Sequence, residues 1–431
     1  MTTSVPLKVA LLGCGVVGSQ VARLLITHEE DFRARIGRPL ELVGIAVRDA
    51  TKPRPGIDPA LFTTDGLALV QRGDIDLVIE LVGGMEPARS LILAAIEAGA
   101  SVVTANKALL AEDGGSIYAA AAAAGVDVYY EAAVAGAIPI IRPLRESLVG
   151  DEVTAVKGIV NGTTNFILDK MHTDAASFSD VLAEAQALGF AEADPTADVE
   201  GFDAAAKAAI LASLAFHTRV RLSDVDREGI TGISPQDIAA AHEMGCVIKL
   251  LANCSLSADG TIAVGVHPTM VPLSHPLAAI PGAYNAVFIE SRYAGRLMFM
   301  GPGAGGSPTA SAVLGDLVTA ARNRARGALG PGESVYSARG ITPADEVSSR
   351  YYVSLVVRDE PGVLAQVAAS FAAQGISLQA VRQDGAVVES RAHLGVMTHV
   401  ATHAQVVATV ADLEAMPHVE PGVTLIRVEA A

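Results

Sequence analysis

The sequence predicts an α/β fold with three successive domains, and three observations support it. A glycine-rich turn joins an apolar strand to a helix near the start of the chain. Strands and helices then alternate to about residue 130, and a second alternating pattern begins after residue 349. Such alternation is typical of α/β architecture. With 431 residues, of which 51% are hydrophobic, the chain can fill two or three cores.

The composition excludes several classes of protein. A net charge of −16 without a block of Lys or Arg argues against nucleic acid and anionic membranes as partners. The chain has no long uncharged apolar run and no signal-peptide pattern, so we expect a soluble cytoplasmic protein. Cys14, Cys246 and Cys254 form no CxxC pair, which argues against a disulfide framework. The histidines do not fit HExxH or a similar ligand spacing, so we expect no catalytic zinc.

The glycine-rich turn predicts a dinucleotide site. The strand LKVALLG runs into GCGVVG, which matches GxGxxG at Gly13, Gly15 and Gly18. In this motif the first glycine permits a tight turn, the second lets a pyrophosphate approach, and the third lets helix and strand pack closely. The following helix offers its N-terminus to the phosphates. The predicted cofactor-binding residues of this turn are Gly13, Gly15, Val16, Val17 and Gly18.

The end of the second strand, at residues 40–49, decides which dinucleotide binds. An acid there accepts hydrogen bonds from the ribose hydroxyls, whereas a cation accommodates a 2′-phosphate. Arg48 stands at this position with Lys52 close behind, which favours NADP. Asp49 follows Arg48 directly, so NAD remains possible if the register moves by one residue.

A later strand, at residues 101–104, leads into a helix through the segment VTANK. Asn106 is the expected N-cap, and Lys107 lies in the first helical turn. Ligands of open α/β sheets bind at the carboxyl edge, so Thr104 and Lys107 should face the cofactor. A cation is disfavoured at a helix N-terminus, which favours a functional role for Lys107 over that of a solvated lysine.

Glu131 precedes a loop of small residues, AAVAGA. Small side chains leave the backbone carbonyls free to face inward, and together with an acid they can form an oxygen-lined cation site. The spacing of Glu131 and the small residues does not by itself establish such a cation site.

Residues 191–212 place charges on an otherwise apolar helix. From Asp203 onward the residues favour a helix, and at about 100° per residue Glu200, Asp203 and Lys207 share one face. Buried charges are costly unless they are paired or used, so this face lines a polar cleft or closes a structural ion-pair network.

The middle of the chain predicts an α+β domain. The segment NGTTN, residues 161–165, can present hydroxyls and amides to a small polar ligand, and Gly162 and Thr163 are its candidate substrate-binding residues. Strand-like runs follow at residues 247–254, 261–271 and 285–300. Together with the helices they suggest an open sheet covered on one side, whose other face is free for a partner subunit. We therefore expect a homodimer or a homotetramer.

The C-terminal region follows a Gly/Pro-rich linker at residues 324–349. The order strand, helix, strand, strand, helix, strand then predicts a small sheet backed by two helices. It resembles the ferredoxin-like ACT domain, an amino-acid-sensing module in which DEPGVLA is the usual turn into the first helix. We expect an amino-acid ligand near residues 359–364 and 374–376, although the tail could instead extend the oligomer interface.

Several long segments together resemble the homoserine dehydrogenase family: GCGVVG, VTANK, EAAVAGAIPII, GIVNGTTNF, LGFAEADPTADVEGFDAAAK and GPGAGGSPTASAVLGD. The resemblance implies reversible NAD(P)H-dependent reduction of L-aspartate 4-semialdehyde to L-homoserine in threonine, methionine and isoleucine biosynthesis. Threonine would be the feedback inhibitor acting through the ACT domain. The implied domains are residues 1–135 for the cofactor, completed by about 303–325, residues 136–323 for substrate and dimerisation, the linker 324–349, and the ACT domain 350–431. Because the chain begins at the cofactor domain, we expect a monofunctional enzyme without a fused aspartate kinase.

The resemblance also implies roles for individual residues. Lys107 and Lys207 look like the catalytic lysines, and Glu192 and Asp203 look like the acids that hold the substrate. An isolated lysine is a poor base near neutrality, but two lysines in one cleft disfavour each other's charge. We expect Lys207 to carry the proton and Lys107 to orient the hydroxyl or share the relay.

The remaining implied positions act mainly through their backbone groups. Glu131 with the carbonyls of Val134, Gly136 and Ile138 looks like the family's monovalent cation site for Na⁺ or K⁺. Gly189, Gly303 and Gly306 look like positions near the cofactor or substrate.

Two alternatives remain open. A dehydrogenase for a related amino-acid aldehyde or amine would share the cofactor half without requiring Lys207 beside Glu192 and Asp203. A redox or metabolite sensor would bind dinucleotide and amino acid without turnover and would not need the two lysines.

Overall fold

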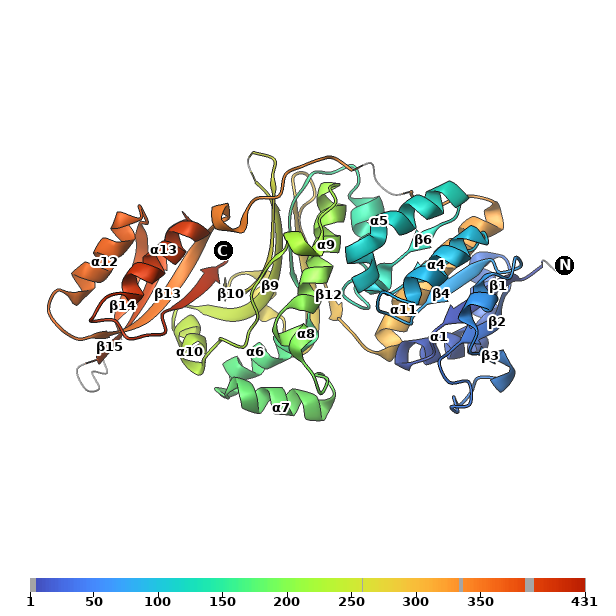
Figure 1. Ribbon diagram of the computed structural model, residues 1–431, viewed down its shortest axis with the longest axis horizontal. Coiled ribbons are helices and arrows are strands. Elements are labelled where there is room, and N and C mark those ends of the chain that lie inside the picture. The colour runs from blue at the N-terminus through green and yellow to red at the C-terminus, as the bar shows by residue number, and fades with distance from the viewer. Residues whose placement is uncertain (1–4, 258, 333–335, 384–390, 431) are drawn as a thin grey trace. The chain divides into compact units, whose positions relative to one another are not determined.

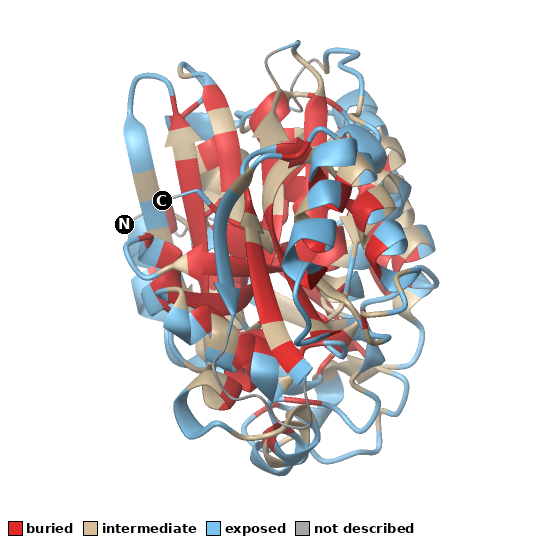
Figure 2. Cartoon of the chain, turned by 90° about the vertical axis from the view of Figure 1, so that its left-hand side faces the viewer, coloured by how far each residue is buried: buried red, intermediate tan, exposed pale blue. Residues whose placement is uncertain are grey.

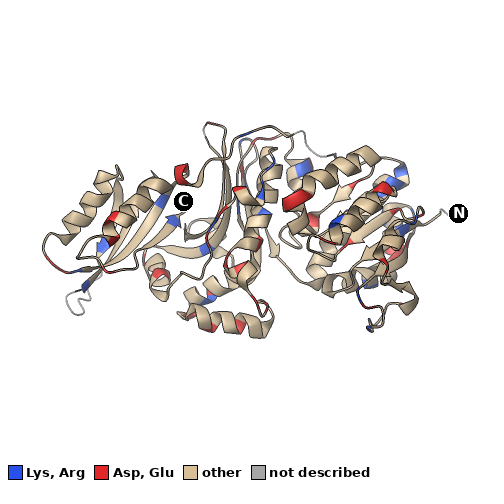
Figure 3. Ribbon diagram, viewed as in Figure 1, with Lys and Arg blue, Asp and Glu red and all other residues tan. Residues whose placement is uncertain are grey.

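The computed structural model describes residues 5–257, 259–332, 336–383 and 391–430 (Figure 1). The chain divides into two compact units, and both are discontinuous in sequence. The first unit comprises residues 1–156, 206–225 and 284–338, and the second comprises residues 157–205, 226–283 and 339–431. Acidic and basic residues are interspersed along the elements of both units (Figure 3). Within the described residues, no helix combines the length and apolar character needed to cross a lipid bilayer.

The first unit is built on a parallel sheet with the strand order β3-β2-β1-β4-β5-β6. Its strands are β1 (Leu7–Leu12), β2 (Leu40–Ala46), β3 (Phe62–Thr63), β4 (Leu77–Glu80), β5 (Ser101–Thr104) and β6 (Val128–Tyr129). The order reverses between β1 and β4, which creates the crevice where doubly wound sheets bind ligands. β4 and β5 are buried throughout, as expected for parallel strands covered on both faces. The predicted Rossmann architecture is thereby confirmed.

Helices from two distant parts of the chain cover this sheet. They are α1 (Val16–Thr27), α2 (Glu29–Ile36), α3 (Gly66–Val70), α4 (Ala88–Glu97), α5 (Lys107–Ala124) and α11 (Gly306–Arg326). Apolar residues of α11, such as Val313 and Leu317, share one core with Val9 and Leu11 of β1. The first unit also holds the hairpin β11 (Tyr284–Ser291) and β12 (Gly295–Pro302), so the single run expected at residues 285–300 is two antiparallel strands.

The second unit contains a sheet with the strand order β9-β10-β17-β13-β15-β14. Its long antiparallel pair is β9 (Cys246–Leu256) and β10 (Ile262–Pro272), and its other strands are β13 (Ser348–Arg358), β14 (Leu378–Gln383), β15 (Arg391–Thr398) and β17 (Thr424–Val428). The short strands β8 (Asp226–Arg227) and β16 (Ala401–Thr402) pair with β10 and β13. β7 (Val153–Ile159) passes from the first unit into the second.

The C-terminal part of this sheet has the predicted ferredoxin-like form. β13, α12 (Val363–Ala373), β14, β15, α13 (His403–Glu414) and β17 follow in the expected order. β13 and β15 are largely buried, whereas β14 at the edge of the sheet is mostly exposed and the helices expose their outer faces (Figure 2). The structure adds a connection that the sequence did not predict. β17 pairs in parallel with β10 at Thr269–Arg427 and Met270–Val428, so the ACT sheet continues into the sheet of the middle region.

The charged segment is two helices rather than one. α8 (Thr196–Val199) ends before α9 (Phe202–Phe216), because Gly201 adopts a left-handed conformation with φ of 77°. Glu200 therefore lies outside α9, and the expected common face with Asp203 and Lys207 is wrong for this residue. The Glu200 carboxylate instead accepts a hydrogen bond of 3.0 Å from the Thr231 hydroxyl, which is a structural contact.

The other helices of the second unit are α6 (Gly162–Asp174), α7 (Phe178–Leu188) and α10 (Pro235–Glu243). Asn161 caps α6 and Ser177 caps α7, each accepting a hydrogen bond from a backbone N–H of the first turn. These caps fix where the helices begin relative to the preceding strand and loop.

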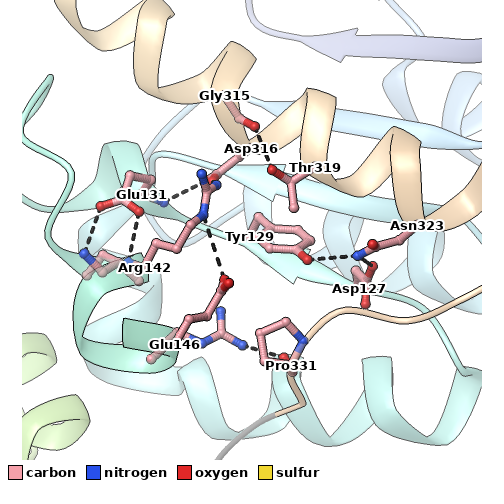
Figure 4. A network of polar contacts seen from close by, with 12 residues as sticks. Asp127, Tyr129, Glu131, Arg142, Glu146, Gly315, Asp316, Thr319, Asn323 and Pro331 are labelled. Carbon is pink, nitrogen blue, oxygen red and sulfur yellow. Dashed lines mark hydrogen bonds and ion pairs between the residues drawn. The ribbon is translucent and has the colours of Figure 1, made fainter. Parts of the chain in front are cut away.

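A buried carboxylate fastens α11 to the end of the parallel sheet (Figure 4). Asp316, which is 1% exposed, accepts hydrogen bonds from the Glu131 N–H at 2.7 Å and the Arg142 guanidinium at 2.6 Å. Further along α11, the Asn323 amide donates to Asp127 at 3.0 Å and to the Tyr129 hydroxyl at 2.9 Å. α11 is thus held by polar contacts at two levels as well as by its apolar face.

Replacing Asp316 with Asn should change how stability depends on pH. Burial raises the pKa of Asp316 from 3.8 to about 7, against the opposing effect of the Glu131 N–H. Because the folded pKa lies above the unfolded one, the stabilising contribution of Asp316 is complete below about pH 4 and is lost as the pH rises to about 7. The Asn side chain stays neutral at every pH. The free energy of unfolding of the Asp316→Asn variant, relative to that of the unchanged protein, should therefore rise by about 1 kcal/mol per pH unit in this window.

Urea unfolding at several pH values measures this difference in the free energy of unfolding. Asp127→Asn, which removes another buried acid beside α11, controls for the loss of hydrogen bonds alone. A difference between Asp316→Asn and the unchanged protein that did not vary with pH would show that Asp316 is not protonated in the folded state.

Candidate active site

The glycine-rich turn after β1 has the geometry of a phosphate-binding loop. A Cβ on Gly13 would lie 2.6 Å from the Leu81 carbonyl oxygen, and one on Gly18 would lie 2.2 Å from the Gly13 carbonyl oxygen. Nothing lies within 4 Å of the position of a Cβ on Gly15, which leaves the turn open above the helix. No side chain caps the N-terminus of α1, and Val16 is 77% exposed there. The backbone N–H groups at this end are therefore available to a pyrophosphate.

The carboxyl ends of three strands meet at one edge of the sheet. In the parallel register Leu12 of β1 pairs with Glu80 of β4, and Glu80 pairs with Thr104 of β5. Glu80 is fully buried, and one carboxylate oxygen accepts from the N–H groups of Val82 and Gly83 at 2.7 and 2.8 Å. The other oxygen accepts from the Thr104 hydroxyl at 2.6 Å. Glu80 thus joins the loops that follow β4 and β5.

Asn106 places Lys107 at the same edge. The Asn106 side chain accepts from the Leu109 N–H at 3.2 Å, which confirms it as the N-cap of α5. Its amide nitrogen donates to the Gly84 carbonyl at 2.7 Å, and its backbone N–H donates to the Thr104 hydroxyl at 3.0 Å. Lys107, the first residue of α5, is half-buried beside this network. The predicted residues Thr104 and Lys107 therefore lie together at the cofactor edge of the first unit.

The position of Lys207 on α9 is nearly closed to solvent. The residue is 8% exposed and is surrounded along its helix by alanines. An ammonium group in such a place must be partnered or used, because burying an unpaired charge is costly. Asp203 lies one turn earlier on the same helix.

A cluster of polar side chains in the second unit surrounds the start of α6. The Asn161 amide nitrogen donates to Asp198 at 2.7 Å and to Asp203 at 2.9 Å. The Thr163 hydroxyl donates to the Phe190 carbonyl at 2.6 Å and to Asp198 at 3.1 Å. Asn161 therefore holds two carboxylates side by side, and the predicted residues Thr163 and Asp203 belong to one network. Asp198 was missed by the sequence analysis, although it shares its acidic segment with Asp203.

Glu192 and Gly189 lie in the loop after α7. Gly189 ends that helix in a left-handed conformation with φ of 78°. The Glu192 side chain is exposed, and its backbone carbonyl accepts from the Gln186 amide at 3.0 Å. The Glu192 carboxylate is thus open to solvent in this loop, and Gly189 ends α7.

The loop after β2 holds Arg54, a basic residue that the sequence analysis did not single out beside Arg48 and Lys52. The Arg48 side chain is exposed in this loop. Asp49 accepts from the Thr51 N–H at 2.8 Å and hydroxyl at 2.6 Å, and these bonds lower the pKa of Asp49. The Arg54 guanidinium donates to the Cys14 carbonyl of the glycine-rich turn at 3.2 Å. The Asp49 carboxylate is therefore engaged in its own turn, while two arginines lie in the loop beside the dinucleotide site.

Glu131, the acid of the predicted cation site, belongs to the network of Figure 4. The Glu131 carboxylate accepts from the N–H groups of Ile140 and Ile141 at 2.6 and 2.7 Å and of Arg142 at 2.9 Å. A carboxylate has about four acceptor positions, so room remains for a single further contact. Burial raises the pKa of Glu131, and Asp316 is a second buried carboxyl group in the same network, where Arg142 and Arg145 both oppose the effect of its burial. Burial disfavours the charged form of both carboxyl groups, and a proton or a bound cation can offset this cost.

The glycines of this region are explained by close packing. A Cβ on Gly136 would lie 2.3 Å from the Gly303 carbonyl oxygen, and one on Gly303 would lie 2.1 Å from the Asn285 side chain. Gly306 begins α11, where a Cβ would lie 3.1 Å from the Val16 side chain. Asn285 is fully buried, and neither atom of its amide has a hydrogen-bond partner within the described chain. Among the described residues, no cluster of three or more His, Cys, Asp or Glu side chains is placed to hold a metal ion.

Three family models match successive parts of the chain. The model for the NAD binding domain of homoserine dehydrogenase matches residues 13–131, and the model for homoserine dehydrogenase matches residues 139–318. The ACT domain model matches residues 351–418. The homoserine dehydrogenases of Mycobacterium tuberculosis and Corynebacterium glutamicum are 54% and 53% identical, over 98% of this chain and 98% and 95% of their own lengths.

Solved structures give the same result. A homoserine dehydrogenase from Thiobacillus denitrificans covers 98% of both chains with a TM-score of 0.92 at 40% identity. A hyperthermophilic archaeal homoserine dehydrogenase in complex with NADPH covers 73% of this chain and 98% of its own, with a TM-score of 0.62 at 26% identity. The resemblance predicted from the motifs is confirmed. The chain belongs to the homoserine dehydrogenase family, a family of NAD(P)-dependent oxidoreductases.

Proposed function

We propose that the enzyme reversibly reduces L-aspartate 4-semialdehyde to L-homoserine, in the pathway to threonine, methionine and isoleucine. The observation that carries this proposal is the nearly buried Lys207, one turn after Asp203 on α9. The network of Asn161, Thr163 and Asp198 that orients Asp203 supports it. An oriented carboxylate can hold the amino group of the substrate, and a buried lysine can handle the proton of its alcohol.

The proton chemistry follows from the two lysines. A nicotinamide cofactor bound at the glycine-rich turn would supply the hydride for the aldehyde carbon, and the residues of this chain would handle the negative charge on the aldehyde oxygen. Lys207 donates a proton to this oxygen and takes it back in the reverse direction. Lys107, at the first turn of α5, orients the oxygen or shares the relay. Asp203 and Glu192 bind the ammonium group, and Gly162 and Thr163 present backbone and hydroxyl groups to the carboxylate end.

The preferred cofactor in this proposal is NADP, with NAD also accepted. Arg48 in the loop after β2 would meet the 2′-phosphate, and Arg54 adds a second cation near the turn. The engagement of Asp49 with Thr51 supports this preference, since it occupies the carboxylate that would otherwise bind the ribose hydroxyls. The other cofactor positions are the turn from Gly13 to Gly18, Thr104, Lys107, Gly189, Gly303 and Gly306.

A monovalent cation, Na⁺ or K⁺, belongs to the same proposal. Its ligands would be the free acceptor position of Glu131 and the carbonyls of Val134, Gly136 and Ile138. The burial of the carboxyl groups of Glu131 and Asp316 in one network, which raises the pKa of each, supports it. Such an ion would neutralise charge and brace the loop that precedes the substrate region.

The same proposal divides the chain into domains. They are a cofactor domain at residues 1–135, completed by 303–325, a substrate and dimerisation domain at 136–323, a linker at 324–349 and an ACT domain at 350–431. The ranges of the family models support it. We further propose a cytoplasmic homodimer or homotetramer inhibited by threonine. The three cysteines are free and buried, which suits a reducing compartment.

Purified enzyme should reduce NADP, and NAD to a smaller extent, only when L-homoserine is added. The measurement is absorbance at the nicotinamide band, with L-serine and L-homocysteine as controls that keep the amino-acid end. Reduction of neither cofactor by homoserine would rule out the proposed reaction. Faster reduction with another amino alcohol or an amine would favour a related dehydrogenase.

Lys207→Met should lower kcat roughly 10²- to 10⁴-fold, the usual contribution of a positioned proton donor. NADP binding, followed by nucleotide fluorescence, should stay intact because the turn at Gly13 is untouched. Lys249→Met is a matched control, since Lys249 is a buried lysine of the second unit with a structural partner in Asp169. It should lower thermal stability but leave kcat within a few-fold. Near-normal turnover in Lys207→Met would exclude Lys207 as the proton carrier.

Arg48→Gln should raise KM for NADPH roughly tenfold or more while hardly changing KM for NADH, because a charge-assisted contact to the 2′-phosphate is lost. Arg72→Gln is the control, since this exposed arginine pairs with Asp74 before β4 and away from the glycine-rich turn. Steady-state kinetics with both cofactors gives the comparison. Equal changes for NADPH and NADH would show that Arg48 does not select the phosphate.

A further inference from the structure

A cavity of about 290 Å³ lies in the first unit between α5 and α9. α5 borders it from Leu110 to Tyr118, and α9 borders it between Ala209 and Leu214. A second cavity of about 220 Å³ adjoins the first and shares with it the side chains of Tyr118, Tyr130 and Tyr336. The larger cavity alone is close to about 300 Å³, the lower limit of usual small-molecule sites. None of its lining residues belongs to the proposed active site.

The cavity adjoins the helix faces that carry the two lysines. Leu110 and Ala111 come one turn after Lys107 on α5. Ile210 comes one turn after Lys207 on α9. Residues three or four positions apart share a face of a helix, so each lysine lies on the face that borders the cavity. At 1.5 Å per residue, the cavity begins roughly 5 Å along each helix from its lysine.

α5 is irregular where it borders the cavity. Asp113 has φ of −135° and ψ of 24°, outside the helical range, and Gly114 and Gly115 follow it. A glycine inside a helix costs about 1 kcal/mol relative to alanine, so two in succession need a physical reason. Gly115 leaves room for Arg219, because a Cβ there would lie 2.6 Å from the Nη1 atom of that guanidinium. The helix thus admits the Arg219 side chain to the wall of the cavity.

Tyrosine rings and arginines are held together in the walls of the two cavities. The Arg219 guanidinium lies over the Tyr336 ring, 4.6 Å from its centre. The Arg145 guanidinium lies over the Tyr130 ring at 5.3 Å, and the Tyr130 and Tyr118 rings pack with 5.5 Å between their centres. Such contacts stabilise one arrangement of the rings and guanidinium groups before a ligand arrives.

The charges around the larger cavity favour an anion. Arg221 also lines it and adds a second guanidinium to that of Arg219. Of the two acids among the described lining residues, Asp113 is paired with Arg89, and Glu112 is exposed to solvent. Guanidinium groups bind carboxylates through paired hydrogen bonds. A ligand therefore finds aromatic side chains and donors for a carboxylate in the same space.

We propose that this cavity binds a small aromatic carboxylate, whose ring lies against the tyrosines of the wall and whose carboxylate meets Arg219 and Arg221. A ligand stabilises the conformation to which it binds, so this one holds α5 and α9 at the spacing of the open cavity. It therefore opposes any approach of Lys107 to Lys207, and turnover falls. The effect on turnover rests on the proposed roles of the two lysines, whereas the binding does not.

Calorimetric titration of the full-length enzyme with 4-hydroxybenzoate, without homoserine or NADP, tests the binding. The probe should bind at least tenfold more tightly than 4-hydroxybenzamide, which lacks the charge, and 4-hydroxycyclohexanecarboxylate, which lacks the flat ring. Hydrogen exchange with bound 4-hydroxybenzoate should show protection at residues 110–118 and 209–214. No binding at millimolar concentration, or equal binding of all three compounds, would overturn the proposal.

Two variants locate the site, and neither touches the catalytic residues. Gly115→Ala should keep the fold because Ala favours a helix more than Gly, while the added methyl group displaces the Arg219 guanidinium. It and Arg219→Gln should weaken binding of 4-hydroxybenzoate at least tenfold. Arg292→Gln is the matched control, since this exposed arginine of the same unit pairs with Glu152, and it should leave binding unchanged. Unchanged binding in both cavity variants would overturn the proposal.

Saturating 4-hydroxybenzoate should lower kcat for homoserine at least twofold in the unchanged enzyme and leave kcat of Gly115→Ala unaffected. Binding at the cavity without a change in kcat would overturn the coupling to the lysines. Protection confined to the glycine-rich turn would place the probe in the dinucleotide site and overturn the whole proposal. Because binding is measured without turnover, a failure of the proposed reaction would not affect the binding result.

Discussion

The carboxyl edge of the parallel sheet in the first unit depends on one buried carboxylate. Glu80 ends β4 at the point where the strand order reverses, and it binds the backbone of the Val82–Gly83 loop and the Thr104 hydroxyl at once. Two loops that belong to different strands are therefore held in one arrangement. Asn106 then connects the second loop to Gly84, and Lys107 follows from it. The geometry expected of the cofactor edge rests on these few short hydrogen bonds rather than on the lysine itself.

In the second unit, too, a single polar side chain holds several groups in place. The Asn161 amide holds Asp198 and Asp203 while its oxygen caps α6, so one side chain sets both the start of a helix and the direction of two carboxylates. The break at Gly201 separates Glu200 from this group and lets α9 begin immediately before Asp203. Charges that are close in sequence therefore have different partners: Glu200 bonds Thr231, whereas Asp198 and Asp203 share Asn161.

Part of the fold and of the candidate site could be predicted from the sequence, because some of the contacts are local. The three glycines of the turn and the Asn106 cap follow from backbone geometry within a few residues, and long motifs identified the family. Glu80 and Asp198 were missed because their partners lie 24 and 37 residues away, where no periodic pattern connects them. Glu200 was misplaced because the helical spacing continues through Gly201, and only the tertiary packing selects its left-handed conformation. The pairing of β17 with β10 joins residues more than a hundred positions apart and leaves no local signal.

That pairing also bears on how the protein is made. β17 is the last strand of its sheet in chain order, yet it lies between β10 and β13. During synthesis, β10 emerges long before the strand that joins it to the ACT module, so the part of its edge at Thr269 and Met270 waits for its partner while that module is translated. An exposed strand edge can pair with other chains. The second unit can therefore close its sheet only after translation has passed β17, which makes its assembly a late event in the biogenesis of the enzyme.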